Sequence, residues 1–149
     1  MIDNTALLHQ LLSQGLIALE EAAFLTLSPT PLPEKWDFER VEGLLLGLAI
    51  GDALGNTTES QLPTTRRQSH GEIRDYLPNQ YAGGQPVGVP SDDSQMAFWA
   101  LEQLLADGGL IPDHLAHKFT RHQIFGIGNT VKDFLLAYKD QGQHWQLAG

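Results

Sequence analysis

The sequence predicts an all-α fold. Apolar residues recur at helical spacing in several segments, as in Leu7, Leu8 and Leu11 and again in Leu101 and Leu105. Glycine or proline follows most of these segments, where helices commonly end. No two neighbouring segments alternate apolar and polar residues as the strands of a hairpin do. We therefore expect a chain built from helices and the turns between them.

The first 34 residues are expected to form a helical hairpin with a connector. Helical spacing runs from Asp3 to about Leu27, and Gly15 divides it into two short helices. Residues 28–33 carry a proline at every second position and predict a stiff extended connector. The hairpin can serve as an extra packing layer or as a dimer contact. Residues 35–149 form the second part of the predicted organisation.

A long helix is predicted from Phe38 to about Leu54, with Asp37 as its N-cap. Its glycines stand four positions apart and form one stripe along the helix. A glycine inside a helix costs about 1 kcal/mol relative to alanine, so we expect another element to pack tightly on the stripe. Asp52 lies in the last turn, where the dipole disfavours a carboxylate unless a neighbouring loop donates a hydrogen bond. The stripe consists of Gly43, Gly47, Gly51 and Gly55.

Residues 56–90 are rich in proline, glycine and asparagine and predict a long loop. Loops of this length in compact domains are usually functional or disordered. Glu59 lies near its start. The residues that make this the most basic part of the chain are Arg66, Arg67, His70 and Arg74. They could bind a pyrophosphate, which arginine contacts bidentately, or they are ordinary solvated surface charges.

Two adjacent carboxylates, Asp92 and Asp93, stand between two serines and precede the apolar helical pattern from Met96 to Leu105. They fall at a helix N-terminus, where acids cap free amides, and Asp92 with Gln95 fits a capping box. A second acid exceeds what capping requires, and it repels the first. The alternative is a hard divalent cation, which favours carboxylate and hydroxyl oxygens. Both explanations stay open for this segment taken alone.

Two further helices are predicted in the last third. Asp113 is expected to cap a helix from His114 to about Phe125, and another helix runs from Val131 to Tyr138. The turn between them, Gly126 to Thr130, contains two glycines. Such a turn can bind phosphate through its backbone amides, and it is also an ordinary helix connection.

Composition restricts the classes of partner. The chain has 149 residues, the length of a single domain, and a net charge of −9, which argues against binding nucleic acid or anionic membranes. Cysteine is absent, which fits a reducing compartment. No apolar stretch reaches the length of a membrane span, and the N-terminus lacks the pattern of a signal peptide. We therefore expect a cytoplasmic protein.

The glycine-rich helix and the acidic pair together resemble the ADP-ribosylglycohydrolase family. The first half of that family carries a Gly-rich helix ending in Gly-Asp-Ala-x-Gly, a Glu four residues later, and a Thr/Ser-Asp-Asp-Thr/Ser metal motif that opens a helix. The matching residues here are Gly51 to Gly55, Glu59, and Ser91 to Ser94. The resemblance covers about residues 36–149, and the turn at Gly126 is a secondary match.

The resemblance implies a compact helical hydrolase with two Mg²⁺ or Mn²⁺ ions at its centre, cleaving the glycosidic bond between ADP-ribose and a modified protein side chain. Ser91, Asp92 and Asp93 would be metal ligands. Glu59 would act as a general acid/base or would position substrate or water, and Asp92 would belong to the catalytic set. The implied ligand is an ADP-ribosylated protein or ADP-ribose. The implied substrate-binding residues are Asp52, Gly126, Gly128 and Asn129.

The second half of the family's metal site has no counterpart in this sequence. Family members are longer, and their second half supplies a further Asp-x-Asp-Thr/Ser motif. The chain is then an incomplete hydrolase, one of two chains that share a site, or a non-catalytic module that binds ADP-ribose or oligomerises. We favour the first interpretation. An apolar helical face left uncovered by the missing C-terminal half predicts self-association or packing with a partner.

Overall fold

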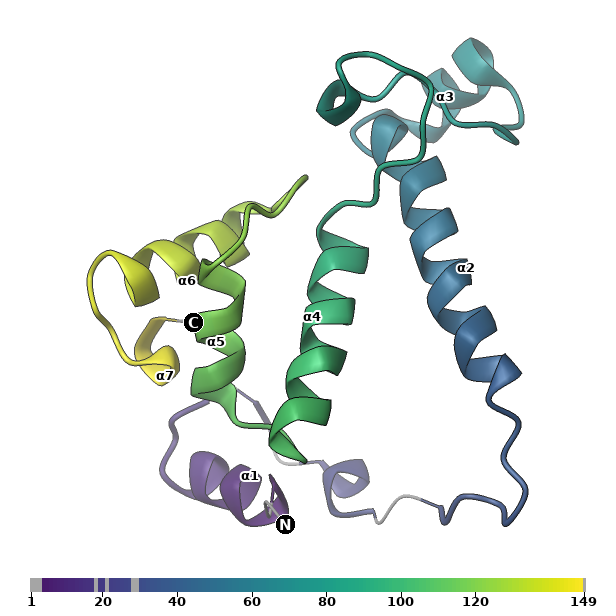
Figure 1. The fold of residues 1–149 in the computed structure, drawn as a ribbon. Helices are drawn as coiled ribbons and strands as arrows, with labels where there is room; N and C mark the ends of the chain where they lie inside the picture. The colour runs from purple at the N-terminus through teal and green to yellow at the C-terminus, as the bar shows by residue number, and fades with distance from the viewer. Residues whose placement is uncertain (1–3, 18, 21, 28–29, 149) are drawn as a thin grey trace. The chain divides into compact units, whose positions relative to one another are not determined.

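The computed structural model describes residues 4–17, 19–20, 22–27 and 30–148. Within these residues the fold is all-α, as predicted, and an isolated β-bridge joins Asn79 to Gln85 (Figure 1). None of the helices described is both long and apolar enough to cross a membrane. The elements are α1 (Asn4–Ser13), η1 (Ala23–Thr26), α2 (Glu39–Gly55), η2 (Asn56–Thr58), α3 (Pro63–His70), η3 (Gln80–Ala82), α4 (Asp92–Asp107), α5 (Pro112–Thr120), α6 (Asn129–Lys139) and α7 (Trp145–Ala148), where η marks a 3-10 helix.

The chain divides into two compact units. The first contains residues 1–37, 100–121 and 129–149, and the second contains residues 38–99 and 122–128. Helix α4 contributes its first half to the second unit and its second half to the first. The boundary predicted after residue 34 concerns the extent of the family resemblance rather than these packing units, and it stays a prediction.

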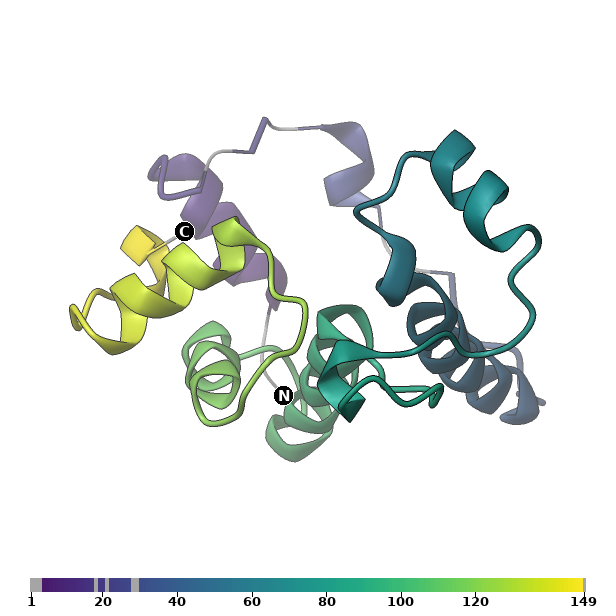
Figure 2. The ribbon, with the colours of Figure 1, turned by 90° about the horizontal axis from the view of Figure 1, so that it is seen from above.

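In the first unit, α5, α6 and α7 pack together, as Figures 1 and 2 show. Asn4 ties α1 to the segment after α4, because its side-chain amide donates to the carbonyl of Leu110 at 2.7 Å and accepts from the amide of Leu110 at 3.1 Å. The prediction of a second short helix after Gly15 is wrong, because among the described residues of that stretch only η1 is helical. Packing contributes little here, since Phe24 within η1 and Leu27 directly after it are exposed.

In the second unit, α2 begins at Glu39, and its N-cap is Phe38 rather than Asp37, with no side-chain capping bond from that residue. The tight packing expected on the glycine stripe is not found among the residues that the structure describes. A Cβ atom placed on Gly43, Gly47, Gly51 or Gly55 would meet no atom within 4 Å. The stripe is therefore an open face of α2 within the described chain.

The segment between α2 and α4 is more ordered than the predicted loop. Helix α3 starts at Pro63, a residue suited to the first helical position, and ends at Gly71, whose φ of 66° favours glycine. Proline at this position signals a helix start, but the eight-residue helix that follows has no apolar periodicity to reveal it. Asn79 then opens η3 by accepting a hydrogen bond from the amide of Tyr81 at 2.8 Å.

The later helices occur where predicted, with shifted ends. Helix α4 begins at Asp92, so the acidic pair forms its first turn. Helix α5 begins at Pro112 with Ile111 as its N-cap, which gives no side-chain capping bond, so the cap expected from Asp113 is wrong. It ends at Thr120, because residues 122–128 leave the helix and join the second unit.

Candidate active site

Asp52, near the C-terminal end of α2, holds the segment that opens α4. One carboxylate oxygen accepts from the backbone amides of Ser91 at 2.7 Å and Ser94 at 3.2 Å. The other oxygen accepts from the hydroxyl of Ser91 at 2.5 Å. Both serines are fully buried. The hydrogen bonds expected between Asp52 and a neighbouring loop are thus present, while its expected contact with substrate stays a prediction.

These bonds replace the local cap that the sequence suggested. Ser91 is the residue before α4 and Ser94 is the third residue inside it, so their amides are the two that a capping box would satisfy. Asp52, which belongs to helix α2, accepts hydrogen bonds from both amides instead. The predicted capping box between Asp92 and Gln95 is wrong, because the Gln95 side chain donates to the carbonyl of Gln123 at 3.1 Å and accepts from the amide of Phe125 at 2.8 Å.

The carboxylates of Asp92 and Asp93 are left free by this arrangement. Neither makes a hydrogen bond or an ion pair with another side chain of the described residues, and Asp92 is half-buried. The pKa of Glu59 is raised above its ordinary value, first by partial loss of surrounding water. The negative charges of Asp92, Asp93 and Asp52 raise it further. The structure thus gathers Glu59 and the acidic pair into one electronegative cluster.

Asp52 has the opposite electrostatic environment. Burial acts to raise its pKa, but the hydrogen bonds from Ser91 and Ser94 outweigh burial and lower the pKa below the ordinary aspartate value of 3.8. Asp52 therefore stays ionised when Glu59 takes up a proton. Two neighbouring acids with pKa values displaced in opposite directions are typical of a site that handles protons.

A partly buried network of side-chain amides supports this carboxylate. Asn56, one turn after Asp52, donates to the carbonyl of Val89 at 2.7 Å and to Asp52 at 3.3 Å. Asn79 is 1% exposed and donates to the side-chain oxygen of Asn56 at 3.2 Å. Neither asparagine was predicted from the sequence as a site residue. The position of Asn56 four residues after Asp52, on one helix face, was the available signal.

Of the glycine turn, Gly126 belongs to the cluster. Its φ is 74°, and a Cβ atom there would lie 3.1 Å from a carboxylate oxygen of Asp92 and 3.1 Å from the Cβ of Ser91. Only a glycine lets this backbone approach the acidic pair so closely. Gly128 is exposed, with nothing within 4 Å of such an atom, and Asn129 opens α6 in the other unit. Roles for these two residues in substrate binding stay predictions.

The donor set at the start of α4 suits a hard cation in part. Ser91, Asp92 and Asp93 offer oxygen ligands alone, as Mg²⁺ and Mn²⁺ prefer. The hydroxyl of Ser91 donates its proton to Asp52 and keeps lone pairs for a cation, and the hydroxyl of Ser94 is buried without a hydrogen-bond partner in the described chain. Nowhere among the described residues do three or more His, Cys, Asp or Glu side chains form a metal-binding group. The set fits one side of a metal site.

Comparison with known proteins gives a consistent result. The family model described as ADP-ribosylglycohydrolase matches residues 33–149. An uncharacterized protein of Archaeoglobus fulgidus is 35% identical over 117 residues, covering 74% of this chain and 37% of its own length. A Serratia proteamaculans protein named ADP-ribosylarginine hydrolase Tri1 is 32% identical over 82% of this chain and 34% of its own length. A Pseudomonas putida protein of the same name is 31% identical over 72% and 30%. The chain thus spans about a third of the length of these relatives.

Proposed function

This chain belongs to the ADP-ribosylglycohydrolase family, and we propose that it carries the acidic half of a hydrolase site that releases ADP-ribose from a modified protein side chain. One observation carries the proposal. Asp52 caps α4 from α2, so the carboxylates of Asp92 and Asp93 have no capping task and face no positive side chain in the described chain. Two unpaired neighbouring carboxylates repel each other, and a bound cation would relieve that repulsion.

Ser91, Asp92 and Asp93 would hold Mg²⁺ or Mn²⁺. When bound, such an ion stabilises negative charge and lowers the pKa of a coordinated water. Glu59 would exchange the proton of the attacking water or the leaving group, because its raised pKa keeps a proton available nearer to neutral pH. Asp52 and Gly126 position the acidic pair through hydrogen bonds and close backbone contact.

The substrate proposed is an ADP-ribosylated arginine. Two relatives that match most of this chain bear the name ADP-ribosylarginine hydrolase. A guanidinium leaving group also suits Glu59, which is not among the proposed metal ligands, because Arg pairs well with carboxylates. The remaining metal ligands would come from a further acidic segment, either on the same polypeptide or on a partner.

A second candidate is a non-catalytic module that binds ADP-ribose or oligomerises. It is favoured by the lack of any three-member group of metal-ligating side chains in the described part of the chain. The two candidates differ in their response to divalent cations.

Calorimetric titration of Mg²⁺ and Mn²⁺ separates them. We expect binding to the 149-residue chain that disappears in Asp92→Asn/Asp93→Asn. The matched control, Asp75→Asn/Asp140→Asn, removes two exposed charges elsewhere and should bind like the parent. Equal binding in all three proteins would place the cation outside residues 91–93. Absence of binding in the parent would favour the non-catalytic module. Release of ADP-ribose from an ADP-ribosylated arginine peptide then tests the reaction itself.

A further inference from the structure

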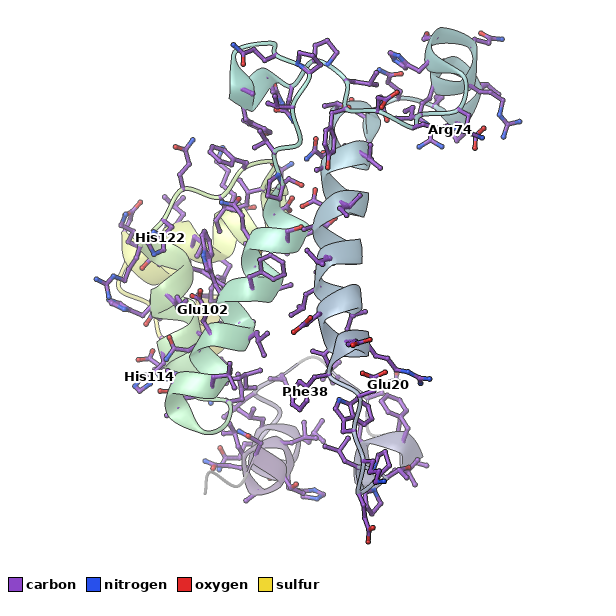
Figure 3. All side chains as sticks on the ribbon, turned by 45° about the vertical axis from the view of Figure 1, so that its right-hand side comes forward. Glu20, Phe38, Arg74, Glu102, His114 and His122 are labelled. Atoms are coloured by element: carbon purple, nitrogen blue, oxygen red, sulfur yellow. The ribbon has the colours of Figure 1, made fainter. Side chains whose placement is uncertain are left out.

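The turn formed by residues 79–85 contains η3 and belongs to the same unit as the acidic pair. The backbone amide of Asn79 donates to the carbonyl of Gln85 at 3.0 Å, and the carbonyl of Asn79 accepts from two amides later in the turn, at 3.1 and 2.9 Å. The turn lies over the start of α4, whereas Arg74 and α3 lie away from it (Figure 3). Asn79 thus closes the turn with its backbone, and its side chain is left for other contacts.

The side chain of Asn79 is 1% exposed, and both of its polar atoms have partners. Its oxygen accepts from the amide of Tyr81 at 2.8 Å, and its amide group donates to the side-chain oxygen of Asn56 at 3.2 Å. The first bond is the usual way in which an asparagine starts a turn. The second bond joins residues 23 positions apart and has no part in the turn itself.

The bond from Asn79 determines which way the side-chain amide of Asn56 points. In the observed orientation the NH₂ group of Asn56 donates to the carbonyl of Val89 at 2.7 Å and to Asp52 at 3.3 Å, while its oxygen accepts from Asn79. A reversed amide would set its oxygen against two other oxygens and its NH₂ group against the NH₂ group of Asn79. Only the observed orientation satisfies all three partners.

Asn56 transmits this constraint to the start of α4. Its NH₂ group is bonded both to the segment that enters α4, at Val89, and to the carboxylate of Asp52 that caps the helix. Val89 precedes Ser91 by two residues, and Ser91 donates its amide and its hydroxyl to Asp52. The acidic pair follows directly after Ser91, so its position depends on this chain of hydrogen bonds.

The turn has a second anchor that does not use the Asn79 side chain. The ring of Tyr81 stacks on the ring of Phe125, with the centroids 4.8 Å apart. Phe125 precedes Gly126, the glycine that approaches Asp92. Replacing the Asn79 side chain therefore breaks one link to the site and leaves the turn attached by the other.

We propose that Asn79 is a positioning residue that fixes the acidic pair for cation binding by holding the amide of Asn56. A buried and fully satisfied network of polar groups specifies one geometry, and the two carboxylates have no other side-chain partner to specify theirs. Asn79 acts through Asn56 and Asp52 and itself touches neither a cation nor a substrate. The assignment rests on the proposed function, because it takes the acidic pair as the site of the cation.

Calorimetric titration of Mn²⁺ into the 149-residue chain tests the assignment. Asn79→Ser keeps a hydroxyl that accepts from the amide of Tyr81 and removes the donor to Asn56. We expect its Mn²⁺ affinity to be about fivefold weaker than that of the parent, as the loss of one buried hydrogen bond predicts. The matched control is Gln80→Ser, which removes an exposed amide from the next residue and should bind Mn²⁺ like the parent.

Amide hydrogen exchange, followed by NMR without added cation, separates positioning from a purely local role. In Asn79→Ser we expect faster exchange at the amides of Ser91 and Ser94, which donate to Asp52. The amides of Ala82 and Gly84 donate to the backbone carbonyl of residue 79 and should exchange as in the parent. A role confined to the turn would give the reverse pattern.

The two measurements distinguish failure of this assignment from failure of the proposed function. Parent-like Mn²⁺ affinity in Asn79→Ser, with parent-like exchange at Ser91 and Ser94, would overturn the assignment and leave the proposed function standing. Failure of the parent chain to bind Mn²⁺ would count against the proposed function. Faster exchange at Ser91 and Ser94 in the variant would then still support the positioning of α4 by Asn79.

Discussion

Helix α2 is held in two different ways along its length. At its C-terminal end Asp52 receives three hydrogen bonds from Ser91 and Ser94, and Asn56 adds a fourth contact. Along the preceding turns Leu44, Leu46 and Ile50 are 70, 63 and 49% exposed, and a Cβ atom placed on any glycine of the stripe would meet no other part of the described chain within 4 Å. One end is specified by hydrogen bonds within the chain. The other consists of residues suited to packing against a polypeptide that the described chain does not supply.

The site is formed by hydrogen bonds within the chain, whereas burial of the apolar surface of α2 requires packing against a further polypeptide. The acidic pair is placed by the backbone amides of Ser91 and Ser94, which donate to Asp52 and belong to residues at most 1% exposed. Such groups give a definite geometry only when they are satisfied. The open turns of α2 add exposed apolar area and four helix-weakening glycines without a packing gain.

The largest effect that tests this comparison is expected at Asp52. Asp52→Ala removes the acceptor of three hydrogen bonds and leaves two buried amides unpaired, so the free energy of unfolding should fall by about 3 kcal/mol. Urea denaturation followed by circular dichroism measures this loss. Asp75→Ala, which removes an exposed carboxylate in the same unit, should change the free energy by no more than about 0.5 kcal/mol. Equal losses in the two variants would show that the hydrogen bonds do not stabilise this end of α2.

The charge of Asp52 gives a smaller effect that depends on pH. Its pKa is lowered in the folded chain, so the ionised carboxylate stabilises the fold at pH values above 3.8, and this contribution is lost as pH falls through the lowered value. The difference in free energy of unfolding between the parent and Asp52→Asn should therefore be constant near neutral pH and shrink in acid below that value. Urea titrations at a series of pH values measure it. A difference that grew on acidification would mean that the carboxylate is protonated in the folded chain.

The sequence alone indicated the helical class, the main helices and the residues Glu59, Asp92 and Asp93, because apolar periodicity and a motif with fixed spacing are local signals. It did not indicate that Asp52 replaces the local cap, because residues 52 and 91 are distant in the chain and only folding brings them together. Helix α3 was missed for a related reason. Its eight residues include no buried side chain, so no hydrophobic pattern marks it, and its start at Pro63 is its main local signal.

The sequence also led to a wrong expectation about the glycine stripe. A spacing of four indicates that one face of the helix lacks side chains, but it does not indicate which polypeptide covers that face. Tight packing was inferred from the cost of glycine in a helix, and the covering element is not among the described residues of this chain. In a chain that contained an element packed on this face, the same glycine spacing would have predicted that packing correctly.

The smallest expected effect tests the open face directly. Gly47→Ala replaces a glycine whose Cβ would meet nothing within 4 Å, so in the isolated chain it should raise the free energy of unfolding by about 0.5 to 1 kcal/mol. Gly126→Ala is the contrasting variant, because its positive φ and its contact with Asp92 make any side chain unfavourable. Urea denaturation measures both variants, and sedimentation velocity reports their association state. If Gly47→Ala instead lowered stability and weakened association of the chain with itself, the stripe would be a contact between copies. The face would then be open only in a single copy.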